Sequence, residues 1–342
     1  MKVIMECFIL VASVTVLGIL LEYFSTNDAI VPCSTSRKLL HAYGRGSCRM
    51  MIRSLEFRPA NHTDFNLNHM VTSYVRNASR ILAGQPKESS EKDVSYDVCQ
   101  KATLVTPHSY PLTALASFPG SGNTWVRYLL ERASGFYTGS VYYDKGLYNG
   151  GFKGEPEKPE KGTTLIVKTH EMRWQKSYKM FEKAVLIVRN PYDCLLAYAN
   201  FNAKGHTGFA SRKYFKSHEW DNFVEKNSQI WENTIASWIA LNNTLVVFYE
   251  DLQSELRQQI TRILKFLGVP LDEERLRCTE AYPQGRFRRN KTDSDRLFDP
   301  YTEQHETIIK THIDAASKLL LEKSYISKNL TYSRLLRING TL

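Results

Sequence analysis

Short apolar runs alternate with longer amphipathic runs from about residue 112 onward, and this alternation limits the possible folds more than any other feature of the sequence. Four compact runs, rich in β-branched residues, have the pattern of buried parallel strands: residues 112–118, 163–169, 183–189 and 244–250. Helical patterns lie between and after them, at residues 124–133, 192–203, 219–240, 253–267 and 302–323. This order predicts an α/β domain with a doubly wound parallel sheet, in which ligands bind at the carboxyl ends of the strands.

The N-terminus carries a second constraint, the apolar segment VIMECFILVASVTVLGILLEYF at residues 3–24. Its charged residues, Glu6 and Glu22, lie near its two ends. At about 1.5 Å per residue, a helix of this length crosses a hydrocarbon core of about 30 Å. A cleaved signal peptide is the alternative, but the segment is longer than the usual apolar region and no A-x-A-like cleavage site follows it. We therefore expect residues 1–24 to form a short cytoplasmic tail and one uncleaved transmembrane helix, a signal anchor.

The rest of the chain is expected to lie in the lumen of the secretory pathway. Lys2 is balanced by Arg37 and Lys38 beyond the apolar segment, so charge bias alone does not settle the orientation. About three N-x-S/T sequons would arise by chance in a chain of this composition. Six are present, a mild excess that is compatible with a lumenal body: Asn61, Asn77, Asn242, Asn290, Asn329 and Asn339.

The cysteines are also compatible with an oxidising compartment. Cys7 lies in the apolar segment, which leaves Cys33, Cys48, Cys99, Cys194 and Cys278. Five thiols allow one or two disulfides with one free or intermolecular thiol, and their spacing does not settle the pairing. The sequence contains no C-x-x-C pair, so we expect no zinc site.

Composition separates a stem from the folded domain. Residues 25–106 are polar, contain the stretch GQPKESSEKD and lack sustained periodicity, so a stem or linker is expected there and a domain at residues 107–342. The formal net charge of +10 favours nucleic acid, an anionic membrane or a phosphorylated cofactor as a partner. Because the basic residues are dispersed and no aromatic-rich nucleic-acid motif appears, nucleic-acid binding is not expected.

A glycine turn, SFPGSGNTW at residues 117–125, follows the first predicted strand and opens the first predicted helix. Gly120 and Gly122 let the backbone curl so that successive amides point into one concavity, where the helix N-terminus adds partial positive charge. A phosphate group is the expected occupant, and an ordinary helix cap is the alternative. Further donors to the phosphate are expected from Ser121, Asn123 and Thr124, and Trp125 is expected to wall the pocket or to pack beneath it. The turn lacks the lysine of a Walker A loop, so an ATP or GTP hydrolase is not expected.

Two motifs in order resemble those of PAPS-dependent sulfotransferases. SFPGSGNTW resembles their 5′-phosphosulfate loop, commonly written with PKSGTTW, and LIVRNPYDCLLAYANF at residues 186–201 is similar to their RNPxDxxxS segment, which binds the 3′-phosphate of the donor. FPGSGNTW, VKTHE and NAKGHTGFA look closest to the sulfotransferase domain of the WSC-domain-containing group, although the cysteine-rich WSC modules are not evident here. The resemblance covers roughly residues 112–323.

By this resemblance, Arg189 would bind the 3′-phosphate that distinguishes PAPS (3′-phosphoadenylyl sulfate) from ATP. A guanidinium at the end of an apolar strand is costly to bury without a partner, and its planar fork suits a phosphate. A structural ion pair with Asp193 is the alternative. Tyr249 is expected to line the adenine pocket, with an ordinary strand-end tyrosine as the alternative.

GRFRRNK at residues 285–291 is similar to the late phosphate-binding segment of the family. Arg288 or Arg289 is the expected phosphate ligand, with Arg288 as the preferred choice, and a solvated run of charge is the alternative. A glycan on Asn290 would crowd a nucleotide at this place.

VKTHE resembles the KTH segment of the family, whose histidine takes the proton of the acceptor hydroxyl. His170 is therefore the expected general base, with Glu171 as the competing candidate, because neutral imidazole accepts a proton near physiological pH. Two positions depart from the family pattern. The lysine of the PKSG loop is Gly120 here, and the serine eight residues after the arginine is Ala197. Lys168 is the candidate to supply the missing cation.

The resemblance implies transfer of a sulfuryl group from PAPS to a hydroxyl of a glycan, sialylated glycans included, or of another secretory-pathway acceptor. The protein is expected to be a single-pass type II protein of the Golgi membrane, held there by its N-terminal helix, and to need no metal. The sequence leaves a homodimer open.

The competing hypothesis is a binding or scaffolding protein that keeps the fold but has lost catalysis through Gly120 and Ala197. Tryptophans 220, 231 and 238 could stack on sugars, but filling the core is the preferred interpretation.

Overall fold

The computed structural model describes residues 96–172 and 180–334. The chain divides into two units, Met1–Pro86 and Lys87–Leu342, and all described residues belong to the second. Within the described ranges no helix is long and apolar enough to cross a membrane. The expected transmembrane helix at residues 3–24, and most of the expected stem, lie outside the described residues.

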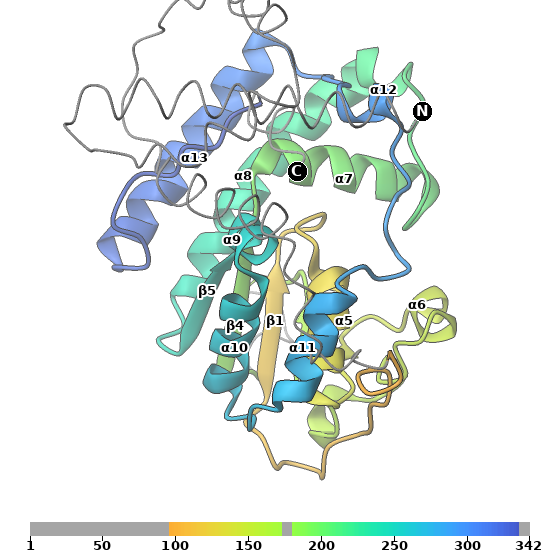
Figure 1. Ribbon diagram of the computed structural model, residues 1–342. Helices are drawn as coiled ribbons and strands as arrows, with labels where there is room; N and C mark the ends of the chain where they lie inside the picture. The colour runs from red at the N-terminus through yellow and green to blue at the C-terminus, as the bar shows by residue number, and fades with distance from the viewer. Residues whose placement is uncertain (1–95, 173–179, 335–342) are drawn as a thin grey trace, which may run out of the picture. The chain divides into compact units, whose positions relative to one another are not determined.

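A five-stranded parallel sheet forms the centre of the domain (Figure 1). Its strands, in chain order, are β1 Thr113–Ser117, β2 Gly139–Ser140, β3 Val167–Thr169, β4 Lys183–Val188 and β5 Thr244–Phe248. In space their order is β2-β3-β1-β4-β5, which places β3 and β4 on the two sides of β1. The strands that follow β1 in the chain lie first on one side of it, as β2 and β3, and then on the other, as β4 and β5. In parallel α/β sheets, ligands bind beyond the carboxyl ends of the strands at such a switch point. The predicted α/β fold with a parallel sheet is confirmed.

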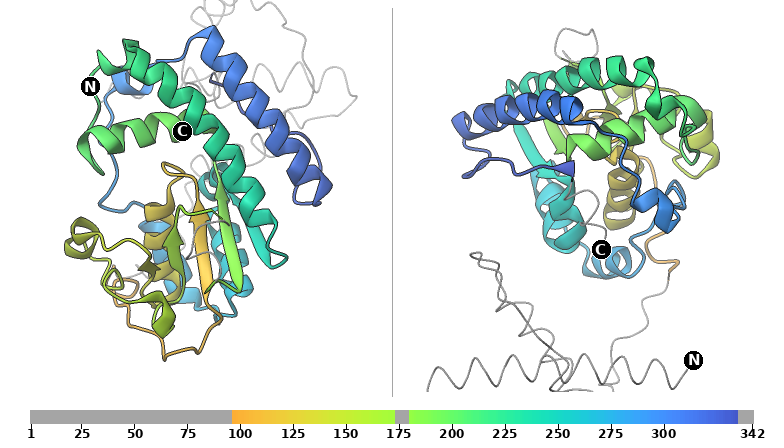
Figure 2. Two further views of the ribbon diagram at one scale, coloured as in Figure 1. Left: turned by 180° about the vertical axis from the view of Figure 1, so that it is seen from behind. Right: turned by 90° about the horizontal axis from the view of Figure 1, so that it is seen from above.

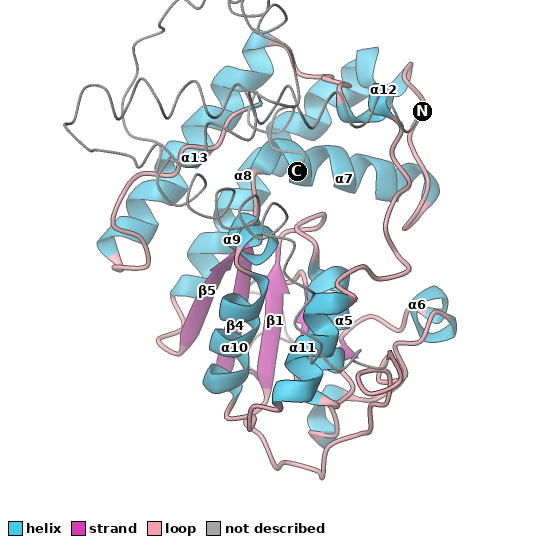
Figure 3. Cartoon of the chain, in the orientation of Figure 1, coloured by secondary structure: helices cyan, strands magenta, loops and turns pink. Residues whose placement is uncertain are grey.

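Helices follow the strands, as the alternation predicts (Figure 3). They are α5 Asn123–Ser134, α6 Lys145–Asn149, α7 Pro191–Lys204, α8 His218–Ile239, α9 Tyr249–Ser254, α10 Leu256–Leu267, α11 Glu273–Ala281, α12 Asp293–Arg296 and α13 Glu303–Glu322. Short 3-10 turns occur at Pro159–Lys161 and Tyr214–Lys216. Four of the five predicted helices begin and end within one residue of the observed α5, α7, α8 and α13. The fifth, at residues 253–267, is interrupted at Glu255, and the last predicted strand ends early because Tyr249 opens α9.

The helices cover both faces of the sheet. Figure 1 shows α5, α10 and α11 in front of the strands, and the view from behind in Figure 2 shows α8 and α13 on the opposite face. Alternate residues of β1 belong to the two cores, because Leu115 packs in the core of the first face whereas Ala114 and Ala116 pack in the core of the second. The strands therefore have apolar side chains on both faces, as expected for a parallel sheet between two helical layers.

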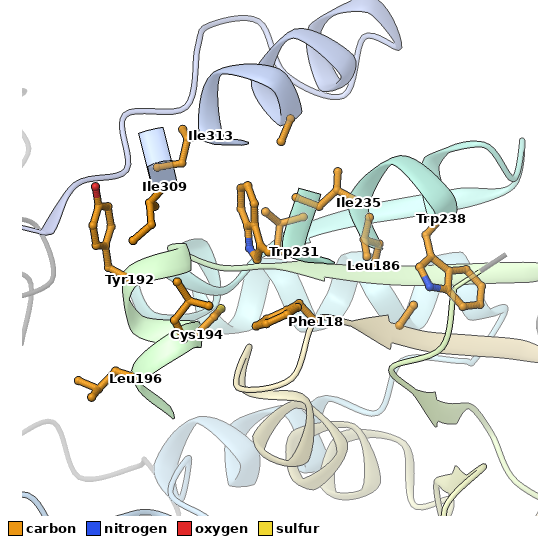
Figure 4. Packing of buried hydrophobic residues seen from close by; sticks show 14 of the residues in the cluster. Phe118, Leu186, Tyr192, Cys194, Leu196, Trp231, Ile235, Trp238, Ile309 and Ile313 are labelled. Carbon is orange, nitrogen blue, oxygen red and sulfur yellow. The ribbon is translucent and has the colours of Figure 1, made fainter. Parts of the chain in front are cut away.

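Small strand residues give room to large rings on α8. Trp220, Trp231 and Trp238 are 0 %, 1 % and 0 % exposed, and all three pack in the same core as Ala114 and Ala116. Figure 4 shows Trp231 and Trp238 in this buried layer with Leu186 of β4. These tryptophans fill the core and offer no ring to a sugar, in agreement with the preferred interpretation.

A disulfide attaches the segment before β1 to the domain. Cys99 is bonded to Cys278 of α11, with a Cα–Cα distance of 5.9 Å. Thr103 pairs with Phe136 in an isolated parallel bridge, and Val105 is buried. The packing of the domain thus begins before residue 107, the boundary expected from composition. Cys194 is a buried free thiol, and Cys7, Cys33 and Cys48 lie outside the described residues.

Candidate active site

The glycine turn joins β1 to α5 and has no space for larger residues. Gly120 and Gly122 have φ angles of 83° and 88°, which glycine adopts without strain. A Cβ atom on Gly120 would lie 2.4 Å from the carbonyl oxygen of Cys194, and one on Gly122 would lie 2.4 Å from a ring carbon of Tyr249. The backbone therefore lies directly against α7 on one side and Tyr249 on the other, at the N-terminus of α5 where an anion is favoured.

Two side chains of the turn point inward. The amide nitrogen of Asn123 donates to the carbonyl of Leu115 at 2.9 Å and to Oγ of Ser117 at 3.1 Å, which fastens the turn to β1. Oγ of Ser121 lies 3.3 Å from the thiol of Cys194, and both atoms are buried. The side chains of Ser121 and Asn123 are thus engaged with protein groups, which leaves the backbone amides as the main donors of the turn.

Trp125 and Tyr249 form an aromatic wall beside the turn. Their rings meet edge to face at 5.3 Å, and the indole nitrogen of Trp125 donates to the carbonyl of Pro283 at 2.7 Å. Both side chains are partly exposed, as is Thr124 at the start of α5. The wall is placed where a flat ring bound next to the turn would contact it.

Arg189, directly after β4, contacts the same turn. Its Nη1 donates to the carbonyl of Gly120 at 3.0 Å, and its guanidinium carbon lies 4.1 Å from the ring centre of Tyr249. The carboxylate of Asp193 is 3.8 Å from Nη2, which is long for an ion pair. Nε of Arg189 is buried and has no hydrogen-bond partner among the described residues. Burial disfavours the charge, but Tyr249 and Asp193 more than offset it and raise the pKa, so the guanidinium stays protonated.

A second guanidinium lies near Arg189. Arg289 donates from Nε to the carbonyl of Gly208 at 2.9 Å and from Nη2 to that of Gly205 at 3.1 Å. Burial lowers its pKa, and the charge of Arg189 lowers it further. Arg288, the preferred candidate from the sequence, is exposed and donates to the side chain of Gln284 at 2.8 Å. The structure therefore bonds Arg289 to the carbonyls of Gly205 and Gly208, within electrostatic reach of Arg189, and Arg288 to Gln284. A phosphate-binding role for either arginine stays a prediction.

His170 follows β3 on the other side of β1. Its Nδ1 lies 2.8 Å from the carbonyl oxygen of Ser117, and because a carbonyl only accepts, Nδ1 carries the hydrogen and Nε2 carries the lone pair. The backbone N–H of His170 donates to the hydroxyl of Tyr142 at 2.9 Å, and the two rings stack at 5.8 Å. Burial, with the charge of Lys168 as a second cause, lowers the pKa of His170 to about 3. The imidazole is thus neutral at physiological pH, with Nε2 as its basic nitrogen.

Lys168 lies on β3 and is 8 % exposed. Burial, reinforced by the charge of Arg127, lowers its pKa to about 8, while Glu155 and Asp144 act in the opposite direction. At pH 7 the ammonium is therefore largely protonated. Lys168 supplies a cation beside His170. In the described ranges, no three or more His, Cys, Asp or Glu side chains are grouped as metal ligands.

A sulfotransferase domain matches residues 112–294, which is more than half of the chain. The chain belongs to the sulfotransferase family. A WSCD family member of Drosophila melanogaster is 45 % identical over 68 % of this chain and 74 % of the relative, and one of Drosophila pseudoobscura pseudoobscura is 44 % identical over 63 % and 68 %. The predicted relationship is confirmed, and it supports sulfuryl transfer as the reaction class.

Two solved structures that contain PAP also match this chain. Mouse sulfotransferase SULT7A1 complexed with PAP is 16 % identical, covering 70 % of this chain and 92 % of that one with a TM-score of 0.38. Retinol dehydratase in complex with androsterone and inactive cofactor PAP is 18 % identical, covering 59 % and 80 % with a TM-score of 0.39.

The two departures of this sulfotransferase from the family pattern are neighbours in space. A Cβ atom on Gly120 would lie 3.2 Å from the Cβ of Ala197. A larger side chain at position 120 would collide with α7 in this conformation of the turn. The two departures thus lie at one contact, the close approach of the turn to α7.

A buried ion pair that the sequence did not predict supports the His170 side of the site. Arg127 of α5 pairs with Glu155, and both side chains are fully buried. Glu155 also accepts from the backbone N–H of Asp144 at 3.0 Å, and Asp144 accepts from Nε2 of His206 at 2.8 Å. These contacts hold the segment that carries Tyr142 in place. Of the four residues, only His206 had a signal in the sequence, through the motif NAKGHTGFA.

Proposed function

We propose that this sulfotransferase moves the sulfuryl group of PAPS onto a hydroxyl of a glycan, sialylated glycans included, or of another secretory-pathway acceptor. The observation that carries the proposal is the convergence of the glycine turn and Arg189 at the carboxyl ends of β1 and β4. The guanidinium bonds to Gly120 itself, and its Nε is a buried donor without a partner among the described residues. An unpaired buried donor next to a backbone anion site fits a phosphate oxygen.

The residues present fit a nucleotide with two phosphorylated positions. The amides of the turn and the N-terminus of α5 would hold the 5′-phosphosulfate. Arg189 and Arg289 would bind the 3′-phosphate, whose negative charge would offset the repulsion by which Arg189 lowers the pKa of Arg289. Trp125 and Tyr249 would contact the adenine. PAPS supplies the activated sulfuryl group.

The protein's own part of the reaction lies at the end of β3. His170 takes the proton of the acceptor hydroxyl on Nε2 as the new oxygen–sulfur bond forms and the bond between sulfur and the phosphate oxygen breaks. Lys168 stabilises the negative charge that develops on the leaving phosphate. In-line sulfuryl transfer resembles phosphoryl transfer, in which positioning and electrostatics contribute most of the rate enhancement. The reaction needs no covalent enzyme intermediate.

Exposed aromatic rings near His170 favour a carbohydrate acceptor. Tyr142, whose ring stacks on His170, is 36 % exposed, and its neighbour Tyr143 is 68 % exposed. Phe201 is 42 % exposed and contacts His206, which bonds to Asp144 next to Tyr143. Exposed rings bordered by hydrogen-bonding groups suit the apolar faces of sugar rings.

A lumenal position in the Golgi, with the N-terminal segment as a type II anchor, belongs to the same proposal. The disulfide between Cys99 and Cys278 supports it, because structural disulfides persist in oxidising compartments. Asn242, Asn290 and Asn329 are exposed in the described domain and therefore accessible to glycosylation. A homodimer stays a prediction.

A binding or scaffolding protein is the second candidate, and the observation in its favour is the loss of the loop lysine at Gly120. Detergent-solubilised full-length protein separates the two. It is incubated with [35S]PAPS and a panel of sialylated and neutral glycans, and PAP binding is measured by calorimetry. We expect sulfate transfer by the wild type and none by His170→Ala. PAP binding without transfer to any glycan would favour the scaffold. Absence of both PAP binding and transfer would refute both candidates as nucleotide-binding proteins.

A further inference from the structure

Helix α8 bonds to the backbone at the ends of two different strands. The indole nitrogen of Trp231 donates to the carbonyl of Arg189 at 3.1 Å. The indole nitrogen of Trp238 donates to the carbonyl of Glu171, the neighbour of His170, at 3.0 Å. One helix thus bonds to Arg189, which is assigned to donor binding, and to the neighbour of His170, which is assigned to proton removal.

The spacing of these two tryptophans suits that task. They are seven residues apart, which is about two turns and about 10.5 Å along one side of a helix. Arg189 follows β4 and His170 follows β3, and β1 lies between these strands in the sheet. The ladder of the sheet connects the two strand ends only through β1, whereas α8 connects them directly.

Burial makes each bond a strong positional restraint. An indole N–H only donates, so a fully buried tryptophan needs an acceptor, and no water can replace it at 1 % or 0 % exposure. The Arg189 carbonyl also receives the Cys194 thiol at 3.7 Å, a long contact from a weak donor. Loss of either indole bond would remove that restraint on the backbone of Arg189 or Glu171.

We infer that Trp231 and Trp238 are positioning residues, and that α8 sets the distance between donor and base. Trp231 fixes the Arg189 backbone and hence the direction of the guanidinium. Trp238 fixes the Glu171 carbonyl and hence the backbone that carries His170. The inference rests on the proposed function, because the effect of Trp231 is measured as donor binding and the effect of Trp238 is measured as turnover.

Trp220 is a matched control on the same helix. It is 0 % exposed, and its indole nitrogen donates to the carbonyl of Pro300 at 3.2 Å, which belongs to neither strand end. Trp220→Phe removes the same kind of bond and the same part of a buried ring as Trp231→Phe and Trp238→Phe. A purely structural role would make the three variants alike.

The test uses full-length protein carrying each phenylalanine substitution. We expect similar decreases in Tm for the three variants. Trp231→Phe should weaken PAP binding about tenfold with little change in kcat, and Trp238→Phe should lower kcat about tenfold with PAP binding unchanged, since small misplacements of reacting groups are costly. A loosened imidazole should also regain a more ordinary pKa, so the acid limb of kcat should move to higher pH in Trp238→Phe alone.

The outcomes separate the inference from the function. If Trp231→Phe and Trp238→Phe behave like Trp220→Phe while the wild type binds PAP and transfers sulfate, the spacing role is wrong and the function stands. If the wild type does neither, both fail. Should a phenylalanine variant not fold, benzothienylalanine at the same position replaces the N–H with sulfur at nearly equal volume, and the same split between PAP binding and kcat is expected. If the benzothienylalanine variants do not show this split, the inference is overturned as well.

Discussion

The ends of β3 and β4 flank the same central strand, yet the ionisable side chain that follows β4 is charged and the one that follows β3 is neutral. Arg189, after β4, keeps its charge because a guanidinium is protonated throughout the physiological range and the carboxylate of Asp193 raises its pKa against the effect of burial. His170, after β3, is neutral because burial and a neighbouring cation, Lys168, act in the same direction. Burial alone therefore does not decide the protonation state of a group. The charges placed beside it do.

The largest expected effect tests the β3 end. His170→Ala should lower kcat about 1,000-fold, because general base catalysis contributes roughly 100- to 10,000-fold. PAP binding should stay within twofold of the wild type, since the imidazole is on the acceptor side. Initial rates of sulfate transfer and calorimetry with PAP measure the two quantities.

Glu171→Gln is the matched control for that prediction. It should retain most of kcat, because the neutral His170 already provides the basic nitrogen. A large loss in Glu171→Gln together with an active His170→Ala would instead assign the base to the carboxylate.

The second prediction tests the β4 end. Arg189→Ala should weaken PAP binding about 100-fold, which corresponds to about 2.7 kcal/mol and is typical for loss of a charged hydrogen-bonding partner. Arg289→Ala should weaken it by a smaller factor, because Arg289 also serves the carbonyls of Gly205 and Gly208.

Arg288→Ala is the control at the neighbouring position, and PAP binding should be nearly unchanged because its guanidinium is exposed and bonds to Gln284. Calorimetric titration of the three variants ranks them. Equal losses in Arg288→Ala and Arg289→Ala would show that the basic segment acts only through its net charge.

The third prediction concerns the contact between the turn and α7. Gly120→Lys would restore the family's lysine, but its Cβ would lie 2.4 Å from the Cys194 carbonyl. The variant should therefore lose about 1–3 kcal/mol of stability and show no gain in kcat.

Ala197→Ser is the compatible change at the same contact, and it should leave Tm nearly unchanged. Thermal unfolding followed by transfer assays measures both variants. An increase of kcat in Gly120→Lys would mean that the turn can withdraw from α7 at little cost.

The smallest expected effect is the dependence on alkaline pH. Lys168 has a lowered pKa of about 8 from burial and Arg127, so kcat/KM should fall to about half of its plateau near pH 8 as the ammonium loses its proton. Between pH 5 and 7 no change from His170 is expected, because its lowered pKa of about 3 keeps it neutral throughout.

Lys168→Arg should remove the alkaline limb, since a guanidinium keeps its charge. A pH profile of kcat/KM for both proteins is the measurement. An unchanged limb in Lys168→Arg would place the titrating group elsewhere.

The sequence predicted those parts of the fold in which local pattern and tertiary packing agree. The strands around Ala114 and Leu186 are buried on both faces, so their composition alone identifies them. Strand β2 has two residues, Gly139 and Ser140, which carry no hydrophobic pattern. Tyr249 continues an apolar run but opens a helix, because strand pairing ends one residue earlier, at Phe248.

Motifs named the residues of the candidate site but did not predict the directions of their side chains. The motif contains both Ser121 and Asn123, yet their side chains turn inward to Cys194 and β1. Arg288 and Arg289 are equivalent in composition, and only the path of the backbone decides which one lies near Arg189. Arg127 was not predicted because a charged helix residue usually faces solvent, and its partner Glu155 lies 28 positions away in the sequence.

The bridge between Cys99 and Cys278 has a mechanical consequence. It ties the chain to α11 before β1 and the glycine turn are reached. A pull applied from the N-terminal side would pass through the covalent link to α11. The strand that leads into the turn would then carry no load.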